Sequence, residues 1–112
     1  MKSGRIILAE LPQSDGKTKL SPALVIKVMP PFNDFLVRGI SSQLHQSVVG
    51  FDEIIDYNDN DFKESGLVQK SLIRLGYLAI IPINIVVGSI GNVSLARLSN
   101  LKQKISSFIL KD

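Results

Sequence analysis

The feature that most constrains the fold is a change of hydrophobic period near residue 94. Before it, short apolar runs of β type alternate with turn signals rich in proline, glycine and asparagine. After it, apolar residues recur every three or four positions, which indicates one amphipathic helix that Ser94 can cap. We therefore expect a mainly β chain with a C-terminal helix, arranged as a small twisted sheet or barrel.

The expected elements follow from these runs. Apolar or alternating segments predict strands at residues 4–11, 22–29, 35–40, 51–55, 66–75 and 83–94. Residues 13–21 predict a polar loop, and Pro22 is expected to open the second strand, where a missing N–H is tolerated. The helix should pack its apolar stripe on the core or on a second copy; the stripe contains Leu95, Leu98, Leu101, Ile105, Phe108 and Ile109.

Length and composition narrow the class of protein. With 112 residues the chain is expected to form a single domain over residues 1–112. It has no cysteine, so disulfides, thiolate metal sites and a cysteine nucleophile are excluded, and a reducing cytoplasm fits. The longest apolar stretch, residues 77–90, is interrupted by Pro82 and Asn84 and is too short for a membrane span. We therefore expect a soluble, cytoplasmic protein without a membrane partner.

Charge is distributed unevenly along the chain. Residues 52–64 hold six of the ten acidic residues and one lysine, a net charge of −5. The rest of the chain holds twelve basic and four acidic residues, a net charge of +8. This pattern is typical of a surface for a polyanion that avoids one acidic edge, or of a solvated acidic loop beside a basic body.

No metal or cofactor site is expected. His45 is the only histidine, and Asp56, Asp59 and Asp61 lack the glycine and glutamate of a calcium loop. The residues that remain still suit metal-free cleavage of RNA, in which the substrate's own 2′-hydroxyl attacks the phosphorus. Such a site needs a base, an acid for the leaving 5′-oxygen, and cations or donors for the phosphorane charge.

Several segments, in order, carry a resemblance to a known family. "SGRIILAELP", "SPALVIKV", "FLVRGISSQLHQ", "SGLVQKSLIRL" and "VVGSIGNVS" followed by a helix resemble the MazF/PemK toxins of bacterial toxin–antitoxin pairs, the PemK-like branch above all. The similarity spans nearly the whole chain. It implies an SH3-like barrel of strongly bent antiparallel strands with a C-terminal helix, usually as a homodimer.

The same resemblance implies an activity and a partner. MazF/PemK toxins are metal-independent, sequence-specific endoribonucleases on single-stranded RNA that leave 2′,3′-cyclic phosphate and 5′-hydroxyl ends. An antitoxin controls them by placing an acidic, disordered tail in the RNA groove. Both implications agree with the basic body of this chain.

The functional positions of the family carry over unevenly. The family's catalytic arginine directly precedes the Pro-Ala-Leu-Val run, and here that position is Ser21. The family's catalytic threonine or serine, at the end of the third strand, matches Ser41 or Ser42, and Gln43 matches the glutamine that follows. Arg74 matches a frequent arginine near the groove, where it could contact phosphate or pair with an acid of residues 52–64.

The departure at Ser21 leaves alternatives open. Lys17 or Lys19 could supply a substitute cation, or both could be ordinary solvated lysines. His45 could act as acid or base, or be structural. The chain could also be a catalytically degenerate, regulatory module that still dimerises and binds an antitoxin. A gyrase-directed toxin of the same architecture is the least favoured alternative.

Overall fold

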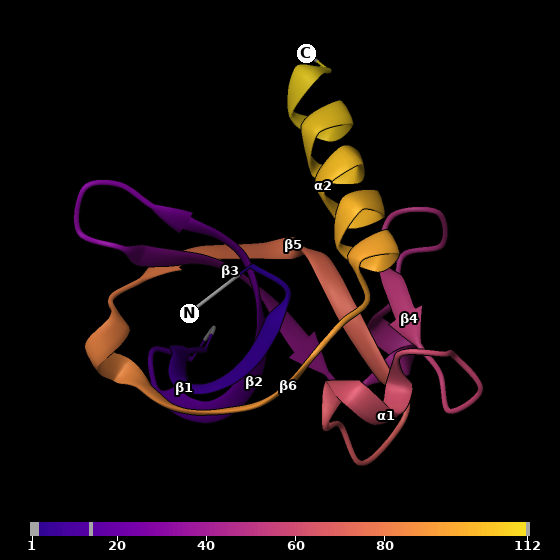
Figure 1. Cartoon of the computed structure of the whole chain (residues 1–112), viewed down its shortest axis with the longest axis horizontal. Coiled ribbons are helices and arrows are strands. Elements are labelled where there is room, and N and C mark those ends of the chain that lie inside the picture. Colours follow the sequence, from indigo (N-terminus) through magenta and orange to yellow (C-terminus); the bar gives the residue numbers. More distant parts are fainter. Residues whose placement is uncertain (1–2, 14, 112) are drawn as a thin grey trace.

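The computed structural model describes residues 3–13 and 15–111 and is mainly β, with a C-terminal helix (Figure 1). Six antiparallel strands form one sheet in the order β4-β5-β3-β2-β1-β6. The strands are β1 Arg5–Pro12, β2 Thr18–Met29, β3 Asp34–Ser41, β4 Glu53–Ile55, β5 Ser71–Ile81 and β6 Val86–Asn92; the helices are α1 Phe62–Ser65 and α2 Leu95–Leu110, with 3₁₀ turns at Leu44–Gln46 and Ile83–Ile85. The expected fold class, mainly β with a C-terminal helix, is confirmed.

The sheet curves strongly, as Figure 1 shows, but it is not closed into a barrel. The edge strands of the sheet are β4 and β6. No further strand pairs with the outer side of β6 among the described residues; the short helix α1, which follows β4 in the chain, packs against it. The approach is so close that a Cβ on Gly91 would overlap the backbone carbonyl of Glu64, and a Cβ on Gly66 would overlap that of Ile90. Glycine at these two positions therefore allows α1 and the residue after it to pack closely against β6.

We expect Gly91→Ala to destabilise the protein by roughly 1–3 kcal/mol, because its methyl group would press on rigid backbone. Gly88→Ala on the same strand is the matched control, since a Cβ there meets nothing within 4 Å. Urea unfolding of both variants measures the two changes. Equal midpoints for Gly91→Ala and Gly88→Ala would contradict the close packing of α1 on β6.

The core lies on both faces of the sheet, because neighbouring strand residues belong to different clusters. Ile6 and Leu24 pack with α2 residues Leu98 and Leu101, whereas Ile7 and Ala23 pack on the opposite face. Strands buried on both sides need continuous apolar runs rather than strict alternation. This explains why residues 4–11 and 22–29 read as β segments without a polar face.

The C-terminal helix docks mainly through its first half, with Ile105 as a further residue packed against the core. Ser94 caps it by accepting a hydrogen bond from the backbone N–H of Arg97 at 3.1 Å, as expected. Leu98 and Leu101 are buried, but Leu95, Phe108 and Ile109 are exposed. The end of α2 extends beyond the sheet in Figure 1, so only part of the predicted stripe belongs to the core. Among the described residues no helix has the length and apolar character that a membrane crossing requires.

Three strand boundaries differ from the predicted ones by four residues or more, and the first residues of the predicted strand 83–94 form a 3₁₀ turn instead. β2 begins at Thr18, four residues before Pro22, because residues 18–22 pair with β1. β3 pairs with β2 only as far as Ala23, so the proline lies where that side of the strand is free, as it requires. β5 spans Ser71–Ile81 rather than 66–75, and Pro82 ends it.

Candidate anion-binding site

A cavity of about 490 Å³ lies beside the end of β3 and collects polar residues from distant parts of the chain. Its walls come from β1, β2, β3 with the segment that follows it, the loop before β5, the middle of β5, and β6. The polar residues that line it are Gln13, Lys19, Ser21, Ser41, Ser42, Gln43, Gln69, Ser71, Arg74 and Tyr77.

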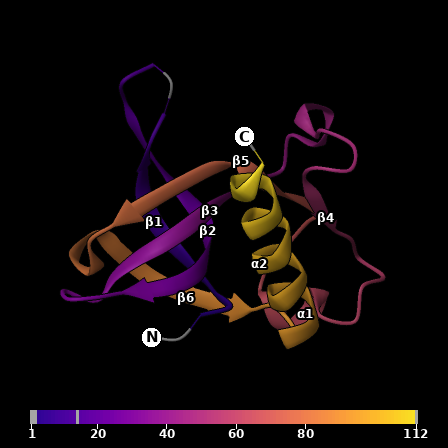
Figure 2. The same cartoon turned by 90° about the horizontal axis from the view of Figure 1, so that it is seen from above.

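One wall is a two-stranded extension of the sheet. β1 and β2 remain paired to Pro12 and Thr18, whereas β6 leaves β1 at Ala9 and β3 leaves β2 at Ala23. Figure 2 shows this hairpin projecting from the body of the sheet. Lys19 therefore lies on a strand that borders the cavity. The predicted loop over residues 13–21 is wrong at this position.

Six of the eight predicted site residues line this cavity. They are Lys19, Ser21, Ser41, Ser42, Gln43 and Arg74. The other two lie outside it: Lys17 is in the exposed turn of the hairpin, and His45 is exposed in the 3₁₀ turn after β3.

The charge of the lining has one sign. Lys19 and Arg74 are its ionisable cations, and none of the described residues that line the cavity is a carboxylate or a histidine. Serine hydroxyls, glutamine amides and a tyrosine supply further donors. The arrangement suits a phosphate or another anion, because its charge would meet cations and hydrogen-bond donors without a repelling carboxylate.

The serine hydroxyls at the cavity are already partly engaged. Ser41 Oγ accepts the backbone N–H of Gln43 at 3.0 Å, which turns the chain after β3 and leaves the hydroxyl proton free to donate. Ser21 Oγ donates to the carbonyl of Lys19 at 3.3 Å, a long bond that a ligand can replace at little cost. Ser42 is exposed at the cavity.

A large bulge in β5 presents Arg74 and Tyr77 to the cavity. Between the pairs Arg38–Leu78 and Ile40–Ile73, β3 contributes one residue, Gly39, whereas β5 contributes four, residues 74–77. Bulges of this kind redirect side chains and occur next to functional sites. The ring of Tyr77 lies over Gly39, where a Cβ would come within 2.9 Å of Tyr77 Cγ.

Tyr77 links the bulge to the hairpin. Its hydroxyl donates a hydrogen bond to the Pro12 carbonyl at 3.1 Å. Burial raises the pKa of Tyr77, and the positive charge of Arg74 offsets part of that rise, so the phenol remains a donor at neutral pH. Sequence reasoning missed Tyr77, together with Gln13 and Gln69, because no motif marks them and the bulge is visible only in the strand register.

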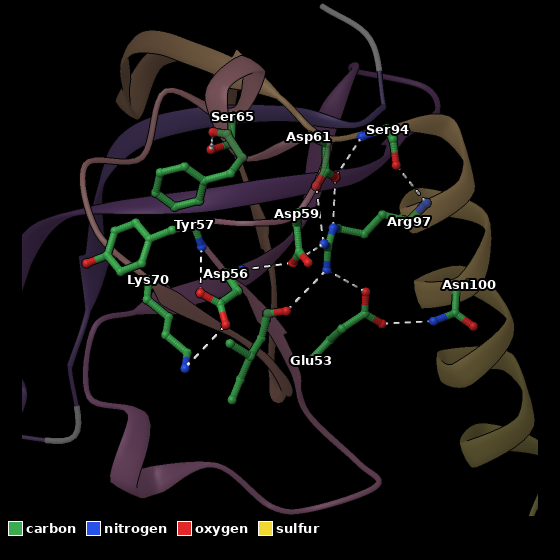
Figure 3. Close-up of polar contacts among 12 residues, drawn as sticks. Glu53, Asp56, Tyr57, Asp59, Asp61, Ser65, Lys70, Ser94, Arg97 and Asn100 are labelled. Atoms are coloured by element: carbon green, nitrogen blue, oxygen red, sulfur yellow. Dashed lines mark hydrogen bonds and ion pairs between the residues drawn. The ribbon is translucent and has the colours of Figure 1, made fainter.

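The acidic segment does not line this cavity, and three of its six acids pair with an arginine of α2. Figure 3 shows Arg97 of α2 at the centre of three carboxylates, with N–O distances of 2.8 Å to each of Glu53, Asp59 and Asp61. Lys104 adds a contact to Glu53 at 3.3 Å. The acids of residues 52–64 thus serve mainly as counter-ions that attach α2 to the segment around β4.

The ion pairs around Arg97 shift the pKa values of Asp61 and Arg97 in the directions that keep both groups charged. Burial alone would raise the pKa of Asp61, but hydrogen bonds from Arg97 and from the backbone N–H of Ser94 outweigh it and lower the pKa. Burial tends to lower the pKa of Arg97, and Asp61, Asp59 and Glu53 reverse that effect and raise it. Arg74 forms no ion pair with any described residue, so the predicted pairing with this acidic segment is absent from the part of the chain described.

Across residues 3–13 and 15–111, no three histidine, aspartate or glutamate side chains are grouped as metal ligands would be.

No protein-family model matches the sequence, and no curated protein matches it.

Proposed function

We propose that this cavity binds single-stranded RNA and that the protein is an endoribonuclease toxin of the MazF/PemK type. The observation that carries the proposal is convergence. Six residues chosen from sequence alone, from three segments far apart in the chain, line one cavity whose two charged side chains, Lys19 and Arg74, are both cationic. Residues picked without regard to function would not be expected to gather in a single cavity.

The proposed chemistry is displacement within the RNA. The substrate's 2′-oxygen bonds to phosphorus and the bond to the 5′-oxygen breaks; the proton of the 2′-hydroxyl passes to solvent water, and a proton from water reaches the leaving oxygen. Lys19 and Arg74 would stabilise the phosphorane charge, and a serine hydroxyl would donate toward the phosphate. Since none of the described lining residues is a histidine or a carboxylate, charge stabilisation supplies most of the rate and turnover should be slow.

The wider biology belongs to the same proposal. The protein would act in the cytoplasm as a homodimer and be held inactive by an antitoxin. An acidic, disordered antitoxin tail suits this cavity because its carboxylates would meet Lys19 and Arg74 and no lining acid. The proposal also assigns the curved sheet to the SH3-like barrel type, with α1 packed against the edge strand β6.

A second candidate function rests on Ser21. A member of the family without the arginine at this position could retain RNA and antitoxin binding and lose cleavage, acting as a regulatory module. Ser21 supplies one neutral hydroxyl where arginine supplies five donors and a permanent charge.

The test is incubation of the pure protein with a long, unstructured RNA in EDTA. We expect discrete fragments with 2′,3′-cyclic phosphate and 5′-hydroxyl ends, and loss of cleavage in the Ser41→Ala/Ser42→Ala double variant. The matched control is Ser106→Ala/Ser107→Ala, an adjacent exposed serine pair on α2, which should cleave as the natural sequence does. Intact RNA at high protein concentration would overturn the enzymatic function, and retained RNA binding would then favour the regulatory module.

A further inference from the structure

A buried arginine lies beneath the β5 bulge. Arg38 on β3 has no exposed surface, and its Nε donates a hydrogen bond to the backbone carbonyl of Arg74 at 3.2 Å. Its two terminal nitrogens, Nη1 and Nη2, have no hydrogen-bond partner among the described residues. Most of the donor capacity of this guanidinium is thus unused, although it is fully removed from solvent.

Stability does not explain this arginine. Burial lowers the pKa of Arg38 to about 10, against the opposing effect of Asp52 and Glu53, so the side chain stays charged at neutral pH. A buried charge with unpaired donors is costly, and an apolar side chain of similar volume is often neutral or stabilising in such a place. The contact that Arg38 does make is to the backbone that carries Arg74.

Asp52 holds the next peptide group of the same bulge. One carboxylate oxygen, Oδ1, accepts the backbone N–H of Leu75 at 2.7 Å, and the other accepts the N–H of Val48 at 3.0 Å. Residues 74–77 have no direct partner on β3, because only Gly39 faces them. Two charged side chains that do not line the cavity therefore replace ladder hydrogen bonds at the Arg74 carbonyl and the Leu75 amide.

We propose that Arg38 is a positioning residue that acts through Arg74, and that with Asp52 it fixes the β5 bulge so that Arg74 faces the bound anion. The inference rests on the proposed function, because it takes the anion to be an RNA phosphate. Arg38 itself cannot touch RNA, since it has no exposed surface.

The salt dependence of RNA binding tests this idea. Each phosphate contact with a single strand contributes about 0.7 to the slope of log K against log salt concentration. Arg74→Met should reduce the slope by about 0.7, and Arg38→Met should reduce it equally, with affinity about tenfold lower in each. The Arg38→Met/Arg74→Met double variant should be no weaker than either single variant, because both remove one contact.

Controls separate positioning from charge and from stability. Lys27→Met removes an exposed cation of β2 that does not line the cavity, and its slope should not change. Arg38→Lys retains a charged donor and should recover part of the affinity. The midpoint of thermal unfolding of Arg38→Met should be unchanged or higher, so unfolding of this variant, or additive losses in the double variant, would overturn the inference.

A measurement without RNA keeps the two proposals distinct. In ¹H–¹⁵N spectra, Arg38→Met should shift the Arg74 Nε–Hε signal and the Leu75 amide signal and speed hydrogen exchange at Leu75. If the natural protein binds no RNA, the proposed function fails, and these signals alone decide the positioning. Unchanged Arg74 and Leu75 signals in Arg38→Met would refute it.

Discussion

A Ser21→Arg variant is expected to cleave single-stranded RNA roughly 10²- to 10³-fold faster than the natural sequence, the gain typical of one well-placed charged donor. Ser21 lines the cavity with Lys19 and Arg74, and among the described residues its hydroxyl makes only the 3.3 Å bond to the Lys19 carbonyl. An arginine there can extend into the cavity and offer a planar fork of donors to the phosphorane oxygens. Single-turnover rates with enzyme in excess over RNA measure the change.

The control for added charge is Thr18→Arg. Thr18 is exposed on the same strand, three residues before Ser21, and does not line the cavity. It should raise RNA affinity at most slightly, through long-range attraction, and leave the cleavage rate constant unchanged. If Ser21→Arg is as slow as the natural sequence, the site lacks more than its arginine, and the regulatory module becomes the better description.

Much of the fold could be predicted because local signals were strong. The 3.6-residue period after Ser94 gave the helix, and the cap that Ser94 was expected to form is present. Strand positions could be predicted from apolar runs, since strands buried on both faces need them. Strand ends could not: β2 begins at Thr18 because pairing with β1, a contact distant in sequence, outweighs the polar character of residues 18–21.

Whether the sheet closes into a barrel could not be predicted from the sequence. A barrel was expected, yet β4 and β6 remain the two edges of an open sheet, and it is α1 that packs against β6. Gly66 and Gly91 permit that packing, but a glycine in a sequence does not reveal which backbone approaches it. The exposed end of α2 was likewise hidden, because a periodic stripe does not say how far along the helix a docking surface extends.

The residues of the candidate site were likewise only partly predictable from the sequence. Lys19, Ser21 and Ser41 were found because they flank recognisable runs, and the fold brings them to one cavity. Arg38 and Tyr77 were missed because their roles depend on the four-residue bulge, and a strand register cannot be read from composition. An arginine inside "FLVRGI" looks like an ordinary polar position until its burial is known.

Arg97→Met is expected to destabilise the protein by about 3–5 kcal/mol, the usual cost of removing one partner from a buried ion pair. Arg97 joins α2 to three carboxylates, and the side chain of Asp61 is only 4% exposed, so its charge would be left without a partner. Methionine retains the length of the stem and confines the change to the charged group. Urea denaturation at neutral pH measures the loss.

Lys70→Met is the matched control, because Lys70 pairs with Asp56 at 3.4 Å and both side chains are about two-fifths exposed. Exposed pairs of this kind contribute about 1 kcal/mol or less, so Lys70→Met should unfold almost as the natural sequence does. Comparable losses in the two variants would mean that burial of the Arg97 cluster has no energetic consequence.

The dependence on pH identifies the charge as the cause. The pKa of Asp61 is lowered in the folded protein, so its stabilising contribution is complete above its ordinary value of 3.8 and is lost as pH falls through the folded value. Removing Arg97 takes away a hydrogen bond and a positive charge that lower the pKa of Asp61, so the carboxyl of the variant should bind a proton at a higher pH than in the natural protein. The difference in unfolding free energy between Arg97→Met and the natural sequence should therefore be largest near neutral pH and should decline as the pH falls through the pKa of Asp61 in the variant. A difference that stays constant with pH would assign the effect to packing of the Arg97 stem rather than to its charge.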